Sequence, residues 1–366
     1  MKKQFFANIL SRFGTSVLLL ALVALMTSCD SVIYDYEEDC EPGTEQPGPD
    51  GPDNPGPAEP DPTVYYVQFK YLLNMQNTDG FSNNVNAVDL YVFNTSGTFV
   101  TKYHEEGAPL TQEGYLMELT DLPAGTYHLI AWCGSNGYTN FFTIPSVISN
   151  RSDVTAELNT ENGVSKTNLP ALFHGQLENA VYNDDEGAQI HTILLTKDTN
   201  NINITLQHKS GLEFTKERFQ VTLTDNNGYM LANNSVPSSN EMVEYLPFKT
   251  SLGTTRAETM GNFLNVELAT SRLMTDHAET SRITVIDTEN NDKVIFSIPL
   301  VKWAIQLRSS EYKKWEDQEY LDREDHFNLM LWLDSYDPET GEDEGWFGAD
   351  VEINDWHVID DELPLQ

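Results

Sequence analysis

Basic residues are scarce in this sequence. The 366 residues include 21 Lys plus Arg against 57 Asp plus Glu, which gives a formal net charge of −36 at pH 7. A protein that binds DNA or RNA needs a positively charged surface, because its lysines and arginines replace the counterions around the phosphates. A chain with this charge repels phosphates, so nucleic acid is excluded as a partner. Hydrophobic residues still make up 39% of the chain, which is enough for a buried core.

Long apolar runs are also missing. The apolar run at residues 17–26 is too short to cross a bilayer as a helix, which takes about 20 residues. It follows Lys2, Lys3 and Arg12, as in a secretory signal, and leads through small residues to Cys29. A bacterial lipoprotein signal ends in this way, because the diacylglycerol is attached to a cysteine thiol. We therefore predict a signal peptide at residues 1–28, lipidation at Cys29 and anchoring to a membrane without spanning it; a plain signal peptide is the alternative.

Cysteine is the third scarce residue, with three in the chain. With Cys29 lipidated, only Cys40 and Cys133 remain, in a compartment that permits disulfides. They could form one bridge between the linker and the first domain, or stay as two thiols. These spacings do not make a metal site, and none of the eight histidines belongs to a His-Glu-x-x-His pair. No metal or other cofactor is therefore expected.

Residues 29–63 have the composition of a tether. Between residues 42 and 62 lie eight of the 17 prolines, and residues 30–63 contain eleven acids and no base. Such a stretch favours an extended chain, which at ~3.1 Å per residue could reach on the order of 100 Å. No Lys or Arg lies between Arg12 and Lys70. An arginine-specific protease therefore has no site in the tether, and the lipid should stay attached to the domains.

From residue 64 onward, apolar residues alternate with polar ones, as in half-buried strands. Alternating runs occupy residues 67–71, 88–93, 202–207 and 327–333, and the polar turn 94–97 ends the second of them. We expect a long loop before a further strand at 191–195, and a helix only around 309–321. The pattern predicts an all-β chain with two tandem antiparallel β-sandwich domains, at residues 64–197 and 198–366.

No catalytic grouping stands out. The segment 132–137 (WCGSNG) lacks the Gly-x-Ser-x-Gly order of a nucleophile elbow. Carboxylates are so abundant that pairs of them carry little information about a glycosidase. The cluster Asp322-Arg323-Glu324-Asp325 is interpreted as a site of structural ion pairs. We therefore expect that the protein is not an enzyme.

Seven short segments resemble a known family, the FimB-type fimbrial anchor lipoproteins (minor fimbrial subunits) of Bacteroidales type V pili. They are residues 88–93 (VDLYVF), 121–127 (DLPAGTY), 172–175 (LFHG), 195–201 (LTKDTNN), 271–274 (SRLM), 320–325 (YLDRED) and 353–356 (INDW). Each segment alone is weak evidence for the family, but all seven occur in order over most of the chain.

The resemblance implies two transthyretin-like β-sandwich domains on a lipid-anchored, surface-exposed protein of the cell outer membrane. Such a protein holds the base of a fimbrial fibre and limits its length. The implied partners are the fimbrial shaft (major) subunits, and the outer-membrane lipid through the N-terminal acyl chains. An acidic segment after the lipidated cysteine resembles a signal for export to the outer face, although a solvated spacer explains it equally well.

The expected mechanism of contact with shaft subunits is strand addition, in which a donated strand pairs with an open sheet edge. The candidate segment alternates Val351, Ile353, Trp356 and Val358 close to the C-terminus. It could equally be the last strand of its own sandwich. The main alternative function is a surface lipoprotein that binds glycans through β-sandwich domains, and a third reading is a lipid-anchored hydrolase.

Overall fold

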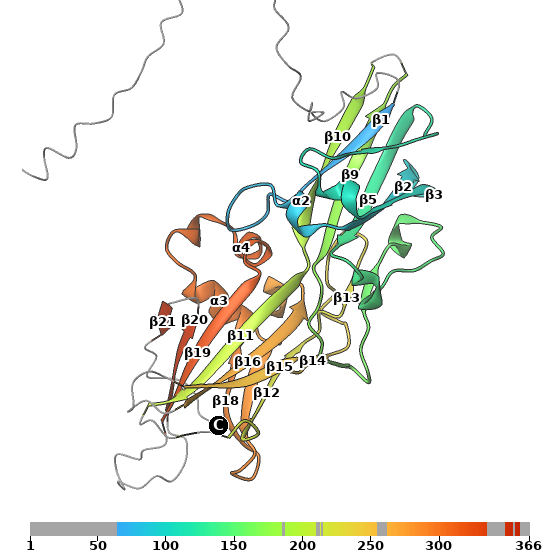
Figure 1. Cartoon of the computed structure of the whole chain (residues 1–366). Helices are drawn as coiled ribbons and strands as arrows, with labels where there is room; N and C mark the ends of the chain where they lie inside the picture. The colour runs from blue at the N-terminus through green and yellow to red at the C-terminus, as the bar shows by residue number, and fades with distance from the viewer. Residues whose placement is uncertain are drawn as a thin grey trace, which may run out of the picture. The chain divides into compact units, whose positions relative to one another are not determined.

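The computed structural model describes residues 64–184, 187–209, 213, 215–254, 262–334, 348–353 and 356–358. These residues are mostly in β-strands, with a few short helices (Figure 1). The all-β fold class with sandwiched sheets is therefore confirmed. The signal peptide and tether predicted at residues 1–63 lie outside the described residues.

A seven-stranded sheet, in the order β3-β2-β5-β9-β10-β1-β4, dominates the first half. Its strands are β1 (Tyr65–Lys70), β2 (Ala87–Asn94), β3 (Phe99–Glu106), β4 (Leu116–Glu118), β5 (Gly125–Gly134), β9 (Leu172–Tyr182) and β10 (Gln189–Lys197). Buried residues of this sheet, among them Val67, Leu90 and Leu129, form a core with Phe81 and Leu110. The period of two along these strands thus places alternate side chains in the core.

The remaining strands form a six-stranded, a five-stranded and a three-stranded sheet. The six-stranded sheet, in the order β15-β16-β11-β19-β20-β21, is built from β11 (Thr199–His208), β15 (Lys249–Thr254), β16 (Asn262–Ser271), β19 (His326–Asp334), β20 (Gly348–Ile353) and β21 (Trp356–Val358). The five-stranded sheet, in the order β18-β17-β12-β14-β8, is built from β8 (Val164–Ser165), β12 (Phe219–Asp225), β14 (Val243–Tyr245), β17 (Arg282–Asp287) and β18 (Lys293–Pro299). The three-stranded sheet consists of β6 (Phe142–Thr143), β7 (Ala156–Leu158) and β13 (Tyr229–Met230).

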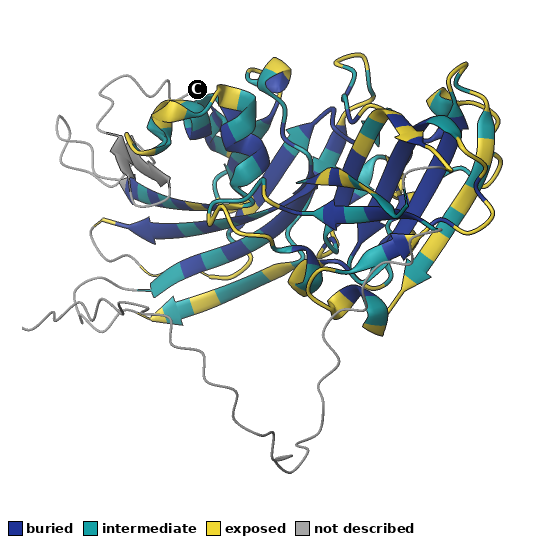
Figure 2. Cartoon of the chain, turned by 90° about the horizontal axis from the view of Figure 1, so that it is seen from above, coloured by how far each residue is buried: buried dark blue, intermediate teal, exposed yellow. Residues whose placement is uncertain are grey.

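The six- and five-stranded sheets share one core cluster, which includes Leu206 and Leu329 from the first sheet and Leu223 and Val285 from the second. Buried residues follow the strand interiors (Figure 2). Removing apolar surface from water contributes roughly 25 cal/mol per Å², so this cluster is a main source of stability. It also contains Trp132 of the first half.

Helices are few and short in the described residues. They are α2 (Phe81–Asn84), α3 (Leu300–Leu307) and α4 (Asp317–Arg323), with 3-10 turns η1 (Ala108–Thr111), η2 (Tyr138–Asn140), η3 (Arg151–Asp153), η4 (Thr275–His277) and η5 (Tyr312–Lys314). The expected helix at 309–321 is therefore divided between η5 and α4, and α3 precedes it.

Two features of the fold differ from expectation. Strand β9 lies in part of the predicted long loop. The sequence pattern missed it because its residues do not alternate: Gly175, Glu178 and Asn179 interrupt the pattern, and Asn179 has a positive φ of 55°. Most described pairings are antiparallel, but β1 with β10, β11 with β19 and β14 with β8 are parallel. Alternation along a strand carries no information about the direction of its neighbour.

Strands on both sides of residue 197 pair with each other. Strand β8 pairs with β14, and β7 pairs with β13. The segment that contains β6, β7 and β8 is therefore integrated with strands of the second half. The domain boundary at residue 197 stays a prediction.

Candidate functional site

A buried polar network lies where the two halves of the chain meet. Its centre is Arg272, which directly follows β16. The Nε atom of Arg272 donates to Oδ1 of Asp322 at 2.9 Å, and one terminal nitrogen donates to Oδ2 of the same carboxylate at 2.7 Å. Asp198 lies on the other side, with its Oδ1 atom 3.6 Å from Arg272 Nε. One guanidinium thus joins α4 to the residue that connects β10 with β11.

Asn234 completes the network. Its Nδ2 atom donates to Asp198 Oδ1 at 2.9 Å, and its backbone carbonyl accepts a hydrogen bond from Arg272. The side chains of Asp198, Asp322 and Arg272 are 0%, 9% and 12% exposed. Charges at this depth are tolerated only when they are paired and hydrogen-bonded, which this arrangement achieves with a bidentate contact.

Burial raises the pKa of Asp198 to about 7, although Arg272 and the amide of Asn234 act in the opposite direction. The Oδ2 atom of Asp198 has no hydrogen-bond partner among the described residues. Nearby, burial lowers the pKa of His174 to about 4, so this ring is neutral at pH 7 and donates from Nε2 to the carbonyl of Ala232 at 3.0 Å. The ring of His174 also contacts Trp132 edge-on, with centroids 4.7 Å apart.

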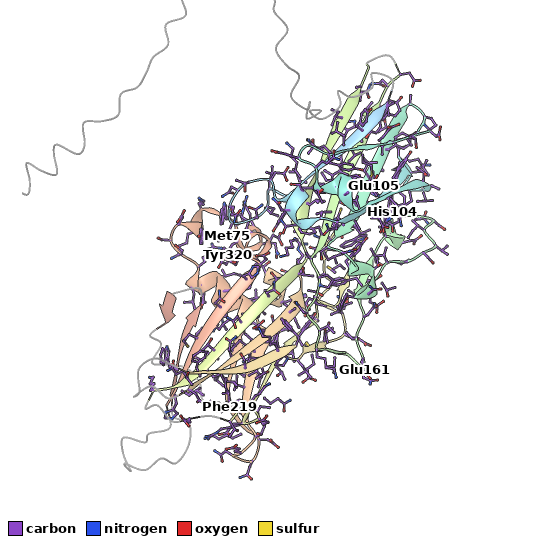
Figure 3. The ribbon with its side chains drawn as sticks, viewed as in Figure 1. Met75, His104, Glu105, Glu161, Phe219 and Tyr320 are labelled. Carbon is purple, nitrogen blue, oxygen red and sulfur yellow. The ribbon has the colours of Figure 1, made fainter. Side chains whose placement is uncertain are left out.

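A second contact joins α4 to the loop that follows β1. Arg323 donates to Asn77 Oδ1 at 2.8 Å and to the carbonyl of Asn74 at 3.1 Å, and its guanidinium lies 4.6 Å from the Trp315 ring centre. Met75 of the same loop packs against the core cluster that contains Tyr320, and both residues are labelled in Figure 3. The exit of β1 is thus fixed to the second half of the chain.

Four of the segments that carry the family resemblance meet in this region. Segment 172–175 contributes His174, 195–201 contributes Asp198, 271–274 contributes Arg272 and 320–325 contributes Asp322. Position 175 in the first of these segments requires glycine, because a Cβ atom there would lie 2.4 Å from Ile193 Cγ2. The interpretation of residues 322–325 as structural ion pairs is confirmed, although their partners lie elsewhere: Asp322 pairs with Arg272, Asp325 with Lys197 and Arg323 with Glu319. Asn234 belongs to no recognised segment.

Of the predicted site residues, Cys29 and Cys40 lie outside the described residues. Cys133 lies in β5 and is fully buried, and burial raises the pKa of its thiol well above the usual range. The bridge between Cys40 and Cys133 therefore stays a prediction.

The predicted strand-exchange residues lie in the last two strands. Val351 and Ile353 belong to β20, which pairs with β19, and Trp356 and Val358 belong to β21, which pairs with β20. In the chain by itself these strands extend their own sheet. At the opposite edge of this sheet, β15 pairs with β16, and no other described strand pairs with it.

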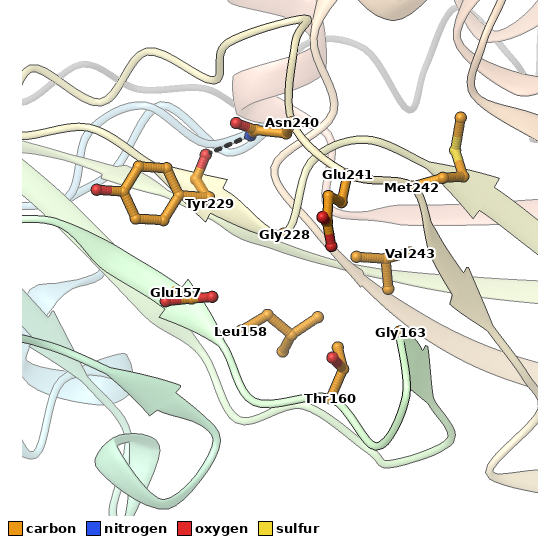
Figure 4. A pocket seen from close by; sticks show the side chains of 10 residues that line it. All are labelled: Glu157, Leu158, Thr160, Gly163, Gly228, Tyr229, Asn240, Glu241, Met242 and Val243. Atoms are coloured by element: carbon orange, nitrogen blue, oxygen red, sulfur yellow. Dashed lines mark hydrogen bonds between the residues drawn. The ribbon is translucent and has the colours of Figure 1, made fainter.

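A hollow of about 280 Å³ lies between β7, β13 and β14 (Figure 4). Its lining includes Glu157, Glu241 and Tyr229. The backbone carbonyl of Tyr229 accepts a hydrogen bond of 2.8 Å from the side chain of Asn240. Within the described residues, no group of three or more His, Cys, Asp or Glu side chains could hold a metal ion. None of the helices in that part of the chain is long and apolar enough to cross a membrane.

Several solved structures resemble this chain. A candidate adhesin from Bacteroides thetaiotaomicron is 28% identical, with a TM-score of 0.70, over 82% of this chain and 98% of that one. A candidate polysaccharide-binding protein from the same species is 26% identical, with a TM-score of 0.69, over 82% and 99%. The fimbrial anchor protein Mfa2 from Porphyromonas gingivalis shares the fold at 14% identity, with a TM-score of 0.61, over 81% and 98%. No curated protein sequence matches the chain.

The chain thus shares its β-sandwich fold with the fimbrial anchor protein Mfa2 and with the candidate adhesin. The sequence profile of the fimbrillin-A associated anchor proteins Mfa1 and Mfa2 matches residues 55–362, and the chain belongs to this family. The resemblance found in the sequence is thus confirmed. Membership implies a fimbrial anchor or adhesin role at the cell surface, in association with fimbrial subunits.

Replacing Arg272 tests the network. Arg272→Met keeps the length of the side chain but leaves two buried carboxylates without their cation, so we expect a loss of about 3–5 kcal/mol in the free energy of unfolding, measured by urea denaturation. The control is Lys249→Met, which breaks an exposed pair with Glu267 and should cost less than about 1 kcal/mol. Equally small losses in both variants would show that the network does not stabilise the fold.

The pKa of Asp198 predicts how stability depends on pH. Because its folded-state pKa of about 7 lies above the ordinary 3.8, the folded state binds the proton more tightly. The contribution of Asp198 to stability is therefore complete below pH 3.8 and is lost as the pH rises towards 7. Asn cannot ionise, so Asp198→Asn should gain stability relative to the wild type between pH 4 and 8, measured by denaturation at several pH values. A difference that does not change with pH would contradict the assignment.

Proposed function

We propose that this protein is a lipid-anchored minor fimbrial subunit that holds the base of a fimbrial fibre on the outer membrane and limits its length. The observation that carries the proposal is family membership across residues 55–362, and the lipoprotein signal predicted at residues 1–28, directly before Cys29, supports it. The acidic, proline-rich tether between the two supports it, since it would separate the sandwiches from the membrane surface. Without Lys or Arg before Lys70, this tether offers no site to an arginine-specific protease.

An anchor transmits mechanical load between the membrane and the fibre. Load from the lipid would enter the described chain at β1, whose exit loop is held to α4 by Arg323. The same helix is held through Asp322 to Arg272, and Arg272 to the connection between β10 and β11. These contacts support a role in which both halves respond to load as one body.

Contact with shaft subunits would occur by strand addition. A strand that joins a sheet edge gains backbone hydrogen bonds, and its alternate side chains fill pockets. The segment with Val351, Ile353, Trp356 and Val358 forms the edge of the six-stranded sheet, next to β19. A subunit held to lipid at its other end would stop the fibre from growing there, which is how the anchor would limit length.

A second candidate function is glycan binding by a surface lipoprotein. It is supported by the similarity to the candidate polysaccharide-binding protein from Bacteroides thetaiotaomicron, at 26% identity. This function requires no fimbriae and predicts affinity for polysaccharide. It is compatible with an anchor role.

Replacement of Cys29 tests lipid anchoring. In Cys29→Ala the acyl chains cannot be attached, so we expect the protein and its fibres in the culture medium, measured by immunoblot of medium and membrane fractions. The matched control is Cys40→Ala, which removes a nearby thiol and should leave the fibres on the cells. Fibres that stay cell-bound in Cys29→Ala would count against the proposal.

Truncation of the C-terminus tests strand addition. Removing residues 351–366 deletes the second half of β20 and all of β21, so we expect at least a tenfold loss of affinity for purified shaft subunit, measured by surface plasmon resonance. Removing residues 359–366 alone leaves both strands in place and serves as the control. Unchanged affinity of a folded 351–366 deletion, with folding checked by circular dichroism, would exclude this segment as the contact.

A further inference from the structure

A second hollow is lined by residues at the end of β1 and in α2. Its volume is about 430 Å³, and three segments line it: the end of β1, residues 79–83 and residues 111–115. Strand β4 pairs with β1 only as far as Gln68, so the hollow begins where this pairing ends. It has the size of a small-molecule subsite.

The hollow has a rigid aromatic wall. Phe69 and Phe81 stack with ring centroids 5.8 Å apart and an interplanar angle of 16°, and Phe81 and Tyr115 stack at 6.4 Å and 11°. Tyr115 is held from the other end as well, because Glu105 of β3, labelled in Figure 3, lies beside its hydroxyl. Burial, and then this carboxylate, raise the pKa of Tyr115, so the hydroxyl stays neutral. Tyr115 is partly exposed and is held by the stacking with Phe81 and by Glu105.

The polar groups of the hollow are available for a ligand. The side chains of Asn83 and Gln112 form no hydrogen bond with any other residue that the structure describes. An amide carries both donors and an acceptor, so each can bond a hydroxyl group in either sense. Asp79, by contrast, is already used: its Oδ1 atom accepts the backbone N–H groups of Tyr71 and Phe81, each at 3.0 Å, and so fixes the loop.

The charge of the hollow limits the class of ligand. Among the described residues, no Lys, Arg or His side chain lines it, and Glu113 adds a negative charge to a chain that is already strongly acidic. Phosphorylated, sulfated and carboxylated ligands would be repelled. A purely apolar ligand would leave the two amides without partners, at a cost in binding free energy.

We propose that this hollow binds a neutral saccharide, with the Tyr115 ring against the face of a sugar ring and the amides of Asn83 and Gln112 on its hydroxyl groups. An aromatic ring flanked by amides that both donate and accept matches a sugar, which has an apolar C–H face and a rim of hydroxyls. The inference gives a site to the second candidate function and does not depend on the anchor role.

The test measures binding of the full mature chain to neutral polysaccharides, namely glucan, mannan and xylan, with polygalacturonate as the acidic comparison, by affinity gel electrophoresis and titration calorimetry. The expected result is binding to at least one neutral polymer and not to polygalacturonate. The double variant Asn83→Ala/Gln112→Ala changes two exposed side chains and should lower the affinity at least tenfold. Gln220→Ala, an exposed glutamine on β12, is the matched control and should bind like the wild type.

Tyr115→Leu provides an independent check, since it removes the ring and keeps an apolar side chain. If that variant fails to fold, the double variant still decides the question. Binding of the wild type that survives the double variant would keep glycan binding as a function and overturn this site. No binding to any of the three neutral polymers would overturn both.

Discussion

The contact of Arg272 with Asp322 and Asp198 is the interaction on which the arrangement of the chain most depends. Two buried carboxylates share one guanidinium, and the residues come from α4, from the end of β16 and from the connection between β10 and β11. Buried charges by themselves oppose folding, so this contact is favourable only when all three segments are in place. The network therefore specifies one arrangement of the two halves, which the shared hydrophobic core alone would define less sharply.

Membership in the fimbrial anchor family provides a functional reason for contacts that join the two halves. We propose that load passes from an acylated N-terminus through the tether to β1, and that the two arginine contacts transfer it to the second half. Arg323 fixes the loop after β1, and Arg272 fixes the connection to β11. In a protein that is pulled at both ends, contacts between the halves keep them together, whereas a flexible hinge would let them move relative to each other.

Much of the fold could be predicted from the sequence, because half-buried strands alternate. Strands β1, β2, β11 and β19 followed from that period alone. Strand β9 did not, since Gly175 serves a close approach to Ile193 and Asn179 has a positive φ, and neither position follows the pattern. The parallel pairing of β11 with β19 joins residues more than a hundred positions apart, and nothing local encodes it.

The network could be predicted only in pieces. The charged cluster at 322–325 pointed to ion pairs, and the resemblance marked the segments that contain Asp198 and Arg272. That these segments meet becomes visible only in the folded structure. Asn234 could not be predicted, because a single asparagine in a loop resembles an ordinary turn residue. The hollow beside Tyr115 was hidden for the same reason, since its three lining segments are separate in the sequence.

We propose that this protein occupies one end of a fimbrial fibre. Immunogold electron microscopy of fibres extracted with detergent, using an antibody against the described sandwiches, tests it most directly. We expect label at one end of each fibre. Label along the whole length, or fibres that carry none, would contradict it.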